Sequence, residues 1–294
     1  MISILIPTYN CPCIDLVKSL QGQCALIKDL KWEIIVADDG STDNSIIEAN
    51  LAINKLAGCL YILREKNTGR AMIRNFLATK SHYGKLLFLD ADVAIQREDF
   101  IQKYISESDT GDIVCGRYDI ISPTRNLSHN LRYIYEKDYI RKHPLSVREK
   151  HPYQSFSTAN FLINRDIMLA HPFDESIREY GYEDVLFGKL LEKENISIKH
   201  IDNPVTLYDF ESNIKFIEKT ETALNTLYHN REKMKGFSRL AHFAEQPVAN
   251  RIITSVYNRK KGQWRKSLCD TSPSLKIFQL YKAGYYITLI QKSH

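Results

Sequence analysis

Short apolar runs alternate with longer mixed stretches along the first half of the chain. The runs have the length of buried strands, and the stretches between them carry apolar residues at helical spacing. This alternation predicts an α/β fold, with a mostly parallel sheet and helices on both of its faces. We expect strands at 2–6, 32–37, 60–64 and 86–89, and helices at 14–30, 43–56 and 69–79.

Beyond residue 118 the pattern is less regular. We expect a return strand at 156–163 and helices at 182–194 and 214–228. The segment 122–151 is long, polar and basic, and its tyrosines at helical spacing indicate that part of it is helical. A connection of this length usually has a function.

Polar clusters occur at 7–10, 38–45, 67–75 and 90–92, each at or just after the end of a predicted strand. Because the carboxyl ends of parallel strands meet at one edge of a sheet, ligands bind there in folds of this kind. The agreement of four clusters carries more weight than any one of them. The sequence therefore predicts a ligand site at this edge.

Asp90 and Asp92 flank Ala91 directly after the apolar run 85–89. Residues i and i+2 of an extended strand point to the same side. Both carboxylates can therefore bind one hard divalent cation, whose coordination is completed by water and substrate phosphates. Acidic pairs are also common on surfaces, so this pair gains meaning from the clusters around it.

The turn after the second predicted strand contains Asp38, Asp39, Ser41 and Asp43. A carboxylate of Asp38 or Asp39 can accept the imide N–H of uracil or bind a ribose hydroxyl. Ser41 or Asp43 also suits the N-cap of the following helix. The two interpretations are compatible, because different residues serve each.

Arg70 and Arg74 open the third predicted helix, after Asn67 and Gly69, and lie on one helical face. A guanidinium near a helix N-terminus suits a nucleotide phosphate or base. A solvated basic face is the alternative, and the sequence leaves it open.

Glu183 and Asp184 precede an apolar-rich helix. Acids in a first turn are favoured by the helix dipole, which is one explanation for them. The functional explanation is that one carboxylate is the general base for an acceptor hydroxyl, which is a poor nucleophile at neutral pH.

Together these residues resemble the family 2 glycosyltransferases, nucleotide-sugar-dependent enzymes with the GT-A fold. The resemblance covers about residues 1–230. It implies a catalytic domain with a nucleotide-binding half over about 1–118 and an acceptor-binding half over about 119–230. Residues 231–294 then form a basic, aromatic-rich helical extension. The motifs that carry the resemblance are Pro7-Thr8-Tyr9-Asn10, Asp38 to Asp43, Asn67-x-Gly69 with Arg74-Asn75, Asp90-Ala91-Asp92, Ser157 to Asn160 and Gly181 to Asp184.

The resemblance implies a role for each motif. Asp90 and Asp92 hold a Mn²⁺ or Mg²⁺ ion that bridges the donor diphosphate. Asp184 is the base of a single in-line displacement with inversion at the anomeric carbon. Asn160 and Glu183 lie near the donor or acceptor sugar. The nucleotide, which we expect to be UDP, contacts Pro7, Thr8, Tyr9, Asp38, Asp39, Asn67, Arg70, Arg74, Asp90 and Ala91.

The chain departs from the family pattern in one place. Many relatives carry a metal-binding His after the last core strand, but the stretch 203–208 has none. His200 lies upstream on the predicted strand, where a lone His favours a structural role. We therefore expect Asp92 and the diphosphate to hold the metal, and to hold it weakly.

The composition, with 44% hydrophobic and 26% charged residues, is that of a folded soluble protein. No apolar run approaches the roughly 18–20 residues that span a bilayer, and the start of the chain lacks the features of a signal peptide. We therefore expect a cytoplasmic protein whose six cysteines are reduced thiols. The sequence has no CxxC pair, which argues against structural zinc.

The net charge of +5 is uneven, since residues 251–294 contain nine Lys or Arg and one acid. With Tyr281, Tyr285 and Tyr286 among them, these residues suit an anionic membrane surface, at the inner face of the cell membrane. An aromatic seam packed within the protein explains the pattern equally well. Nucleic acid is a third partner that fits such composition, and the least favoured.

We predict an inverting, metal-dependent glycosyltransferase that moves a sugar from a UDP-sugar to a glycan or lipid-linked oligosaccharide precursor of a surface polysaccharide, with the segment 122–151 closing over both substrates. A nucleotidyltransferase that makes a sugar nucleotide shares the sheet and the paired carboxylates. It usually needs a Gly-rich, basic loop, and 7–12 contains neither Gly nor a basic residue. A non-catalytic GT-A scaffold is the third hypothesis, which the missing His keeps open.

Overall fold

The computed structural model describes residues 1–120, 126–244, 247–270 and 272–292. The chain divides into two compact units. The first, here called the sheet unit, comprises Met1–Ile121, His143–Arg178 and Phe187–Tyr208. The second, the helical unit, comprises Ser122–Lys142, Glu179–Leu186 and Asp209–His294. The predicted division at residue 230 stays a prediction, and the helical unit draws on three separate stretches of the chain.

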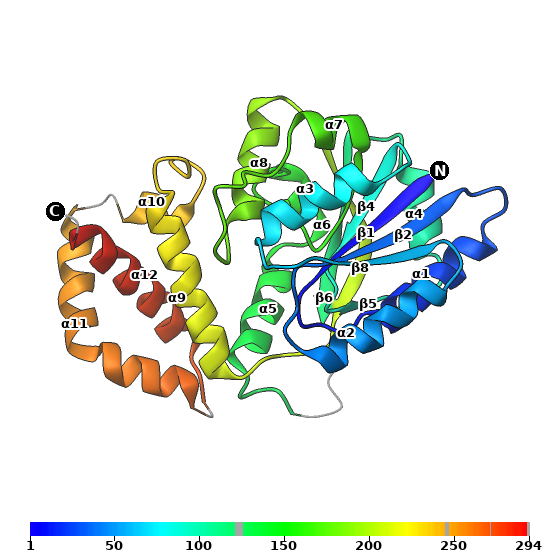
Figure 1. Ribbon diagram of the computed structural model, residues 1–294. Coiled ribbons are helices and arrows are strands. Elements are labelled where there is room, and N and C mark those ends of the chain that lie inside the picture. Colours follow the sequence, from blue (N-terminus) through cyan, green and yellow to red (C-terminus); the bar gives the residue numbers. More distant parts are fainter. Residues whose placement is uncertain (121–125, 245–246, 271, 293–294) are drawn as a thin grey trace. The chain divides into compact units, whose positions relative to one another are not determined.

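An eight-stranded mixed sheet crosses the sheet unit in the order β3-β2-β1-β4-β7-β6-β8-β5 (Figure 1). The first four strands in this order are parallel, whereas β7 runs antiparallel to both of its neighbours. This is the mixed, mostly parallel α/β sheet that the sequence predicts. The strands are β1 (Ile2–Thr8), β2 (Trp32–Asp38), β3 (Cys59–Leu63), β4 (Lys85–Leu89), β5 (Val93–Ala94), β6 (Ile113–Ile120), β7 (Asn160–Asn164) and β8 (Ile198–Leu207).

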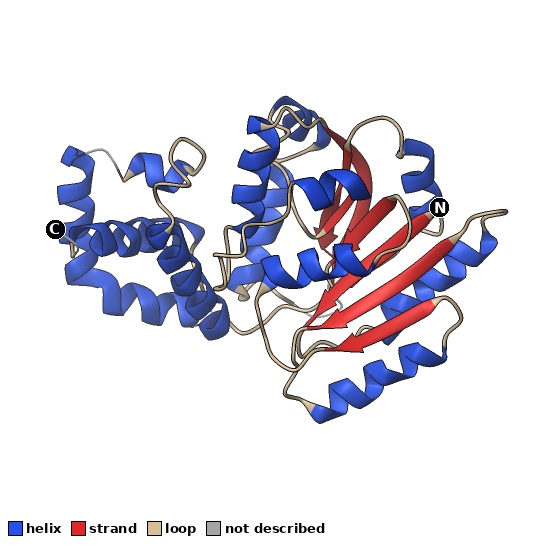
Figure 2. Ribbon diagram, turned by 45° about the horizontal axis from the view of Figure 1, so that its top comes forward, coloured by secondary structure: helices blue, strands red, loops and turns tan. Residues whose placement is uncertain are grey.

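Helices lie on both sides of these strands (Figure 2). Alternate residues of a strand point to opposite faces, so Leu5 and Phe88 enter one buried cluster with α3, α7 and α8, while Ile4 and Leu87 are buried on the other side. Phe88 stacks on Phe161 of β7, with ring centroids 5.0 Å apart. The helices of this unit are α1 (Ile14–Leu26), α2 (Asn44–Leu51) with the 3₁₀ turn η1 (Ala52–Lys55), α3 (Arg70–Lys80), α4 (Phe100–Glu107), α6 (Leu145–Lys150) and α7 (Arg165–Ala170). Helix α8 (Glu183–Lys193) begins in the helical unit and continues into the sheet unit.

The helical unit has its own core, in which Leu131, Phe216, Tyr257, Phe278 and Tyr281 pack together. The aromatic seam of the C-terminal segment is therefore largely buried here. No helix among the described residues has both the length and the hydropathy needed to cross a membrane. The helices are α5 (Leu131–Lys142), α9 (Asn213–His229), α10 (Arg239–Phe243), α11 (Pro247–Cys269) and α12 (Leu275–Gln291).

Several predicted boundaries differ from the observed ones. Helix α1 ends at Leu26 because Ile27 is extended and Asp29 has a positive φ of 59°. The return strand β7 starts at Asn160, four residues after the predicted start. Phe156 is buried, but it lies in the irregular stretch before the strand. The segment 122–151 contains α5 and α6, as its tyrosine spacing partly indicates, but residues 121–125 lie outside the described part of the chain.

Candidate active site

The carboxyl ends of the first strands meet at one edge of the sheet, as predicted. Thr8 at the end of β1 pairs with Asp38 at the end of β2, and Asp38 pairs with Leu63 at the end of β3. Phe88 of β4 pairs with Leu5, so Asp90 follows at the same edge. The register therefore brings the polar clusters after these strands together.

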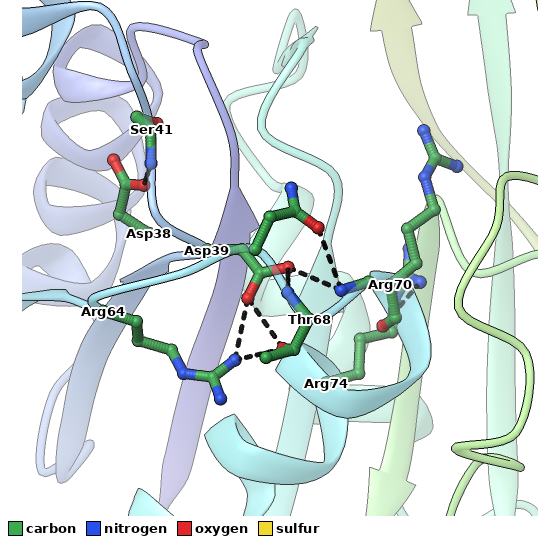
Figure 3. Close-up of polar contacts among 9 residues, drawn as sticks. Asp38, Asp39, Ser41, Arg64, Thr68, Arg70 and Arg74 are labelled. Atoms are coloured by element: carbon green, nitrogen blue, oxygen red, sulfur yellow. Dashed lines mark hydrogen bonds and ion pairs between the residues drawn. The ribbon is translucent and has the colours of Figure 1, made fainter.

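Asp39 is buried and bonded to the loop that leads into α3 (Figure 3). Its Oδ2 accepts the backbone N–H groups of Thr68 at 2.9 Å and Gly69 at 2.8 Å. Its Oδ1 accepts from Arg64 Nη1 at 2.8 Å and Thr68 Oγ1 at 2.9 Å. Two acceptor sites on each oxygen are thus used within the protein. The arrangement makes Asp39 the anchor of the loop that contains Asn67.

Asp38 is also buried. Its Oδ1 accepts the backbone N–H of Ser41 at 2.7 Å, and its Oδ2 accepts the hydroxyl of Tyr61 at 2.6 Å. Burial, followed by this hydrogen bond, raises the pKa of Tyr61, so Tyr61 stays a donor. Sequence reasoning missed Tyr61 and Arg64, because neither lies in a recognisable motif.

Two turns at this edge are joined by Asn10, which has a positive φ of 47°. Its Oδ1 accepts the N–H groups of Thr42 at 2.9 Å and Asp43 at 3.1 Å, and its own N–H donates to Ser41 Oγ at 2.7 Å. Asp43 caps α2 by accepting from the N–H groups of Ser45 and Ile46. The predicted N-cap is therefore confirmed, at Asp43.

The remaining residues of the first predicted cluster differ in exposure. Thr8 is buried and donates its hydroxyl to the carbonyl of Cys11 at 2.9 Å. Pro7 is half-buried, and the Tyr9 side chain is 46% exposed. Tyr9 is thus a member of this cluster with a large solvent-exposed surface.

The two arginines at the start of α3 have different environments. Arg74 is buried, and its Nη2 donates to Asp90 Oδ1 at 2.8 Å. Its guanidinium also lies 5.8 Å from the centre of the Phe173 ring. Arg70 is exposed, and its side chain extends away from the Asp39 cluster in Figure 3. The alternative of a solvated basic face, which the sequence leaves open, therefore describes Arg70 better than Arg74.

Asp90 and Asp92 come directly after β4, on either side of the buried Ala91. Both are part-buried, and Asp90 is 24% exposed in its ion pair with Arg74. No group of three or more His, Cys, Asp or Glu able to hold a metal occurs among the described residues. Two carboxylates that leave most coordination positions to water and phosphate suit Mg²⁺ or Mn²⁺, which bind oxygen ligands.

His200 contributes to the fold. Its Nδ1 lies 3.1 Å from Arg148 Nη1, and its Nε2 lies 2.9 Å from the carbonyl oxygen of Pro152. Burial lowers the pKa of His200 from 6.5 to about 4, so the ring is neutral at pH 7. Both ring nitrogens are thus used inside the protein.

Nearer the carboxylates, Val93 pairs with Leu207, which brings the end of β8 beside Asp92.

Asn160 begins β7, and its side chain is buried. The amide oxygen accepts the hydroxyl of Tyr104, and the amide nitrogen donates to the carbonyls of Asn203 at 2.7 Å and Arg117 at 3.2 Å. These contacts tie β7 to β6 and β8. The predicted proximity of Asn160 to a sugar stays a prediction, and the geometry favours a supporting role.

Glu183 and Asp184 occupy the first turn of α8, in the helical unit. The two residues before them, Gly181 and Tyr182, have positive φ angles of 98° and 69°. A Cβ at Gly181 would lie 2.8 Å from Ala223, so only Gly fits this turn. Glu183 is buried and Asp184 is half-buried. A carboxylate on a turn held this tightly is well suited to accept a proton from a hydroxyl.

Residues 3–169 of the sequence match the family model of glycosyl transferase family 2. The chain belongs to this family. The predicted family, and with it a glycosyltransferase enzyme, is confirmed. A search of curated proteins finds no match.

Solved structures with the same fold include complexes with UDP or with a GDP-sugar. TarS 1–349 of S. aureus, in complex with UDP, shares 19% identity at a TM-score of 0.51 and covers 99% of this chain and 90% of its own. The mannosyltransferase PcManGT from Pyrobaculum calidifontis, in complex with GDP-Man and Mn²⁺, shares 13% identity at a TM-score of 0.62. The match covers 99% of this chain and 86% of PcManGT. Glucosyl-3-phosphoglycerate synthase from Mycobacterium tuberculosis, with Mn²⁺ and UDP, shares 16% identity at a TM-score of 0.52. The match covers 78% of this chain and 79% of the synthase. At these identities the likeness shows the fold, and the predicted GT-A fold is confirmed.

Proposed function

We propose that this family 2 chain is an inverting glycosyltransferase that uses a UDP-sugar and a divalent metal. The observation that carries the proposal is the ion pair between Arg74 and Asp90, 2.8 Å long, at the carboxyl edge of the sheet beside Asp92. A buried guanidinium orients one carboxylate of the pair. Proteins with the same fold have been crystallised with UDP or with a GDP-sugar, and two of them with Mn²⁺. These complexes support this choice of donor and metal.

In this proposal the nucleoside lies between the turns that follow β1, β2 and β3. Tyr9 offers an exposed ring for stacking. Asn67 and Pro7 border the base, and Arg70 faces the diphosphate. Asp38, Asp39 and Thr8 are buried and bonded within the protein, so they act by holding these turns in place.

Asp90 and Asp92 would hold the Mn²⁺ or Mg²⁺, with Ala91 keeping the turn between them compact. When bound, such an ion offsets the charge that develops on the departing diphosphate. The binding is weak in this proposal, because the described chain offers no group of three ligands. The protein itself orients Asp90 through its ion pair with Arg74.

Asp184 is the general base of the proposed reaction. It accepts the proton of the acceptor hydroxyl while the hydroxyl oxygen bonds to the anomeric carbon and the bond to UDP breaks, with inversion. Glu183 and Asn160 support the sugar side. The product is a glycan or lipid-linked oligosaccharide, extended by one sugar, of a surface polysaccharide pathway.

We further propose that the enzyme works in the cytoplasm, peripherally attached to the inner face of the cell membrane. On α11, Ile252 is 64% exposed and Val256 is 40% exposed. Arg259 and Lys260 follow on the same side of the helix and are exposed as well. An apolar stripe continued by basic residues suits anionic lipid headgroups.

The membrane contact is tested by sedimentation with phosphatidylglycerol vesicles. Exchanging Arg259 and Lys260 for Glu should abolish binding, whereas the same charge change at the exposed Lys28 and Lys31 of the sheet unit should not. Equal loss in both variants, or equal binding to phosphatidylcholine vesicles, would reject this surface.

The decisive experiment for the donor site is calorimetric titration of UDP, with and without Mn²⁺, into wild type and Asp92→Ala. Metal-dependent binding that Asp92→Ala loses supports the proposal, and hydrolysis of a panel of UDP-sugars then finds the donor. If UDP does not bind while GDP or dTDP does, the donor carries a nucleobase other than uracil.

Two rival functions give distinct results. A nucleotidyltransferase releases pyrophosphate, where a glycosyltransferase releases UDP, and product analysis separates them. If UDP, GDP and dTDP all fail to bind, the non-catalytic scaffold is the better explanation.

A further inference from the structure

Asn75 follows Arg74 on α3, and its amide is bonded to a distant segment. Its Nδ2 donates to the carbonyl of Phe173 at 3.0 Å, and its Oδ1 accepts the N–H of Phe173, also at 3.0 Å. Nδ2 further donates to Glu175 Oε1 at 3.0 Å. One side chain thus fixes both backbone groups of Phe173, as a neighbouring strand does in a sheet.

The same segment also comes close to the backbone at the start of α3. Gly69, the N-cap of α3, has a φ of 93°, and a Cβ there would lie 2.7 Å from the carbonyl oxygen of Arg178. The chain from Phe173 to Arg178 therefore runs along the first turns of α3. All of these residues belong to the sheet unit.

Phe173 links this segment to α8. Its ring stacks on that of Phe187, with centroids 4.0 Å apart and an angle of 18° between the planes. Both side chains are 2% exposed. Phe187 lies about one helical turn after Glu183 and Asp184, because an α-helix has about 3.6 residues per turn. The position of the Phe187 ring therefore bears on the turn that carries both carboxylates.

We propose that Asn75 is a positioning residue for the transfer step, which acts through Phe173 and Phe187 on the first turn of α8. This inference rests on the proposed function of Asp184. The neighbouring residues of α3 then serve different ends, since Arg74 orients Asp90 on the donor side and Asn75 orients the helix of the general base. Substituting each should affect a different measured quantity.

The first test compares wild type with Asn75→Ala by hydrogen–deuterium exchange. Asn75→Ala should speed exchange at the start of α8 at least tenfold and leave the affinity for UDP with Mn²⁺ within twofold. With the UDP-sugar that wild type hydrolyses, kcat should fall by up to about 100-fold at unchanged KM, since small misplacements of a catalytic group have effects of this size. Glu175→Gln keeps an acceptor for Nδ2 and is the matched control, expected to behave as wild type.

Two further variants exclude a simple folding defect. Phe173→Leu keeps an apolar side chain but removes the ring stack, so it should show the same fast exchange in α8. Asn75→Asp places a carboxylate against Glu175, and adding Glu175→Gln, whose amide can donate to it, should restore part of the protection.

Unchanged exchange in α8 for both Asn75→Ala and Phe173→Leu overturns the inference, as does a UDP affinity that falls in parallel with kcat. These outcomes differ from a failure of the proposed function, in which wild type itself binds no UDP. The exchange experiment needs no nucleotide and so decides the linkage in either case.

Discussion

Arg74 on α3 and Asp90 at the end of β4 form an ion pair of 2.8 Å, in which the Arg74 side chain is 2% exposed and the Asp90 side chain 24%. A buried guanidinium of fixed charge holds one oxygen of the carboxylate in place. The donor side of the site thus depends on the packing of α3 against the sheet.

Replacing Arg74 with Met should destabilise the protein and weaken UDP binding. The loss of a buried charged hydrogen bond is expected to lower the free energy of unfolding by about 1–3 kcal/mol. Urea unfolding and UDP calorimetry measure the two effects. Arg70→Met, on the exposed surface of the same helix, should change stability by less than about 0.5 kcal/mol. Equal losses of stability in both variants would contradict the structural role given to Arg74.

Gly69→Ala should destabilise the protein by about 1–3 kcal/mol. The backbone at Gly69 has a φ of 93°, and the new methyl group would lie 2.7 Å from the carbonyl oxygen of Arg178. Gly22→Ala is the control, because Gly22 lies within α1 and nothing is within 4 Å of its Cβ position. That change should stabilise by about 0.5–1 kcal/mol, since Ala favours a helix over Gly. Thermal or urea unfolding of both variants checks the contrast.

Stability should fall between pH 7 and pH 5 because of His200. Burial lowers the pKa of His200 from 6.5 to about 4, so the unfolded chain binds more protons in this window. Stability therefore rises with pH there and is lost on acidification, by about 2 kcal/mol from pH 7 to pH 5.

The control for this pH effect is His200→Gln. Its amide can accept from Arg148 and donate to the Pro152 carbonyl without titrating. Urea unfolding at both pH values should show a smaller change in this variant. A change as large as in wild type would assign the effect to other groups.

Asp184→Asn should abolish sugar transfer while UDP binding persists. The amide keeps the size of the side chain but cannot accept the proton, so kcat for the UDP-sugar should fall about 10²–10⁴-fold. Calorimetry with UDP and Mn²⁺ provides the control measurement. An Asp184→Asn enzyme with wild-type turnover would remove Asp184 from the role of base and favour a non-catalytic domain.

Much of the sheet could be predicted from local pattern. The strands from β1 to β4 are recognisable because buried strands are short apolar runs. Asp38 and Asp90 are recognisable because they are polar residues at the ends of such runs. The boundaries at 14–30 and 156–163 were less accurate, since helix ends and turns depend on single residues such as Asp29. The N-cap at Asp43 was predictable because capping is a local interaction.

The partners of the site residues could not be predicted in the same way. Tyr61 and Arg64 lie outside any motif, yet they hold Asp38 and Asp39. Asn75 belonged to a motif, but nothing local indicates that it binds Phe173, 98 residues away. Such contacts depend on which helix packs on which strand.

The sequence by itself determined the alternation of strands and helices, the polar edge of the sheet and the family, because these follow from periodicity and from short motifs. Only the tertiary structure decided that Arg74 pairs with Asp90, that Asp39 anchors the loop before α3 and that Asn75 holds Phe173. The physical reason is that hydrogen bonds between distant residues require side chains to lie within about 3 Å of each other. Folding of the whole chain sets those distances.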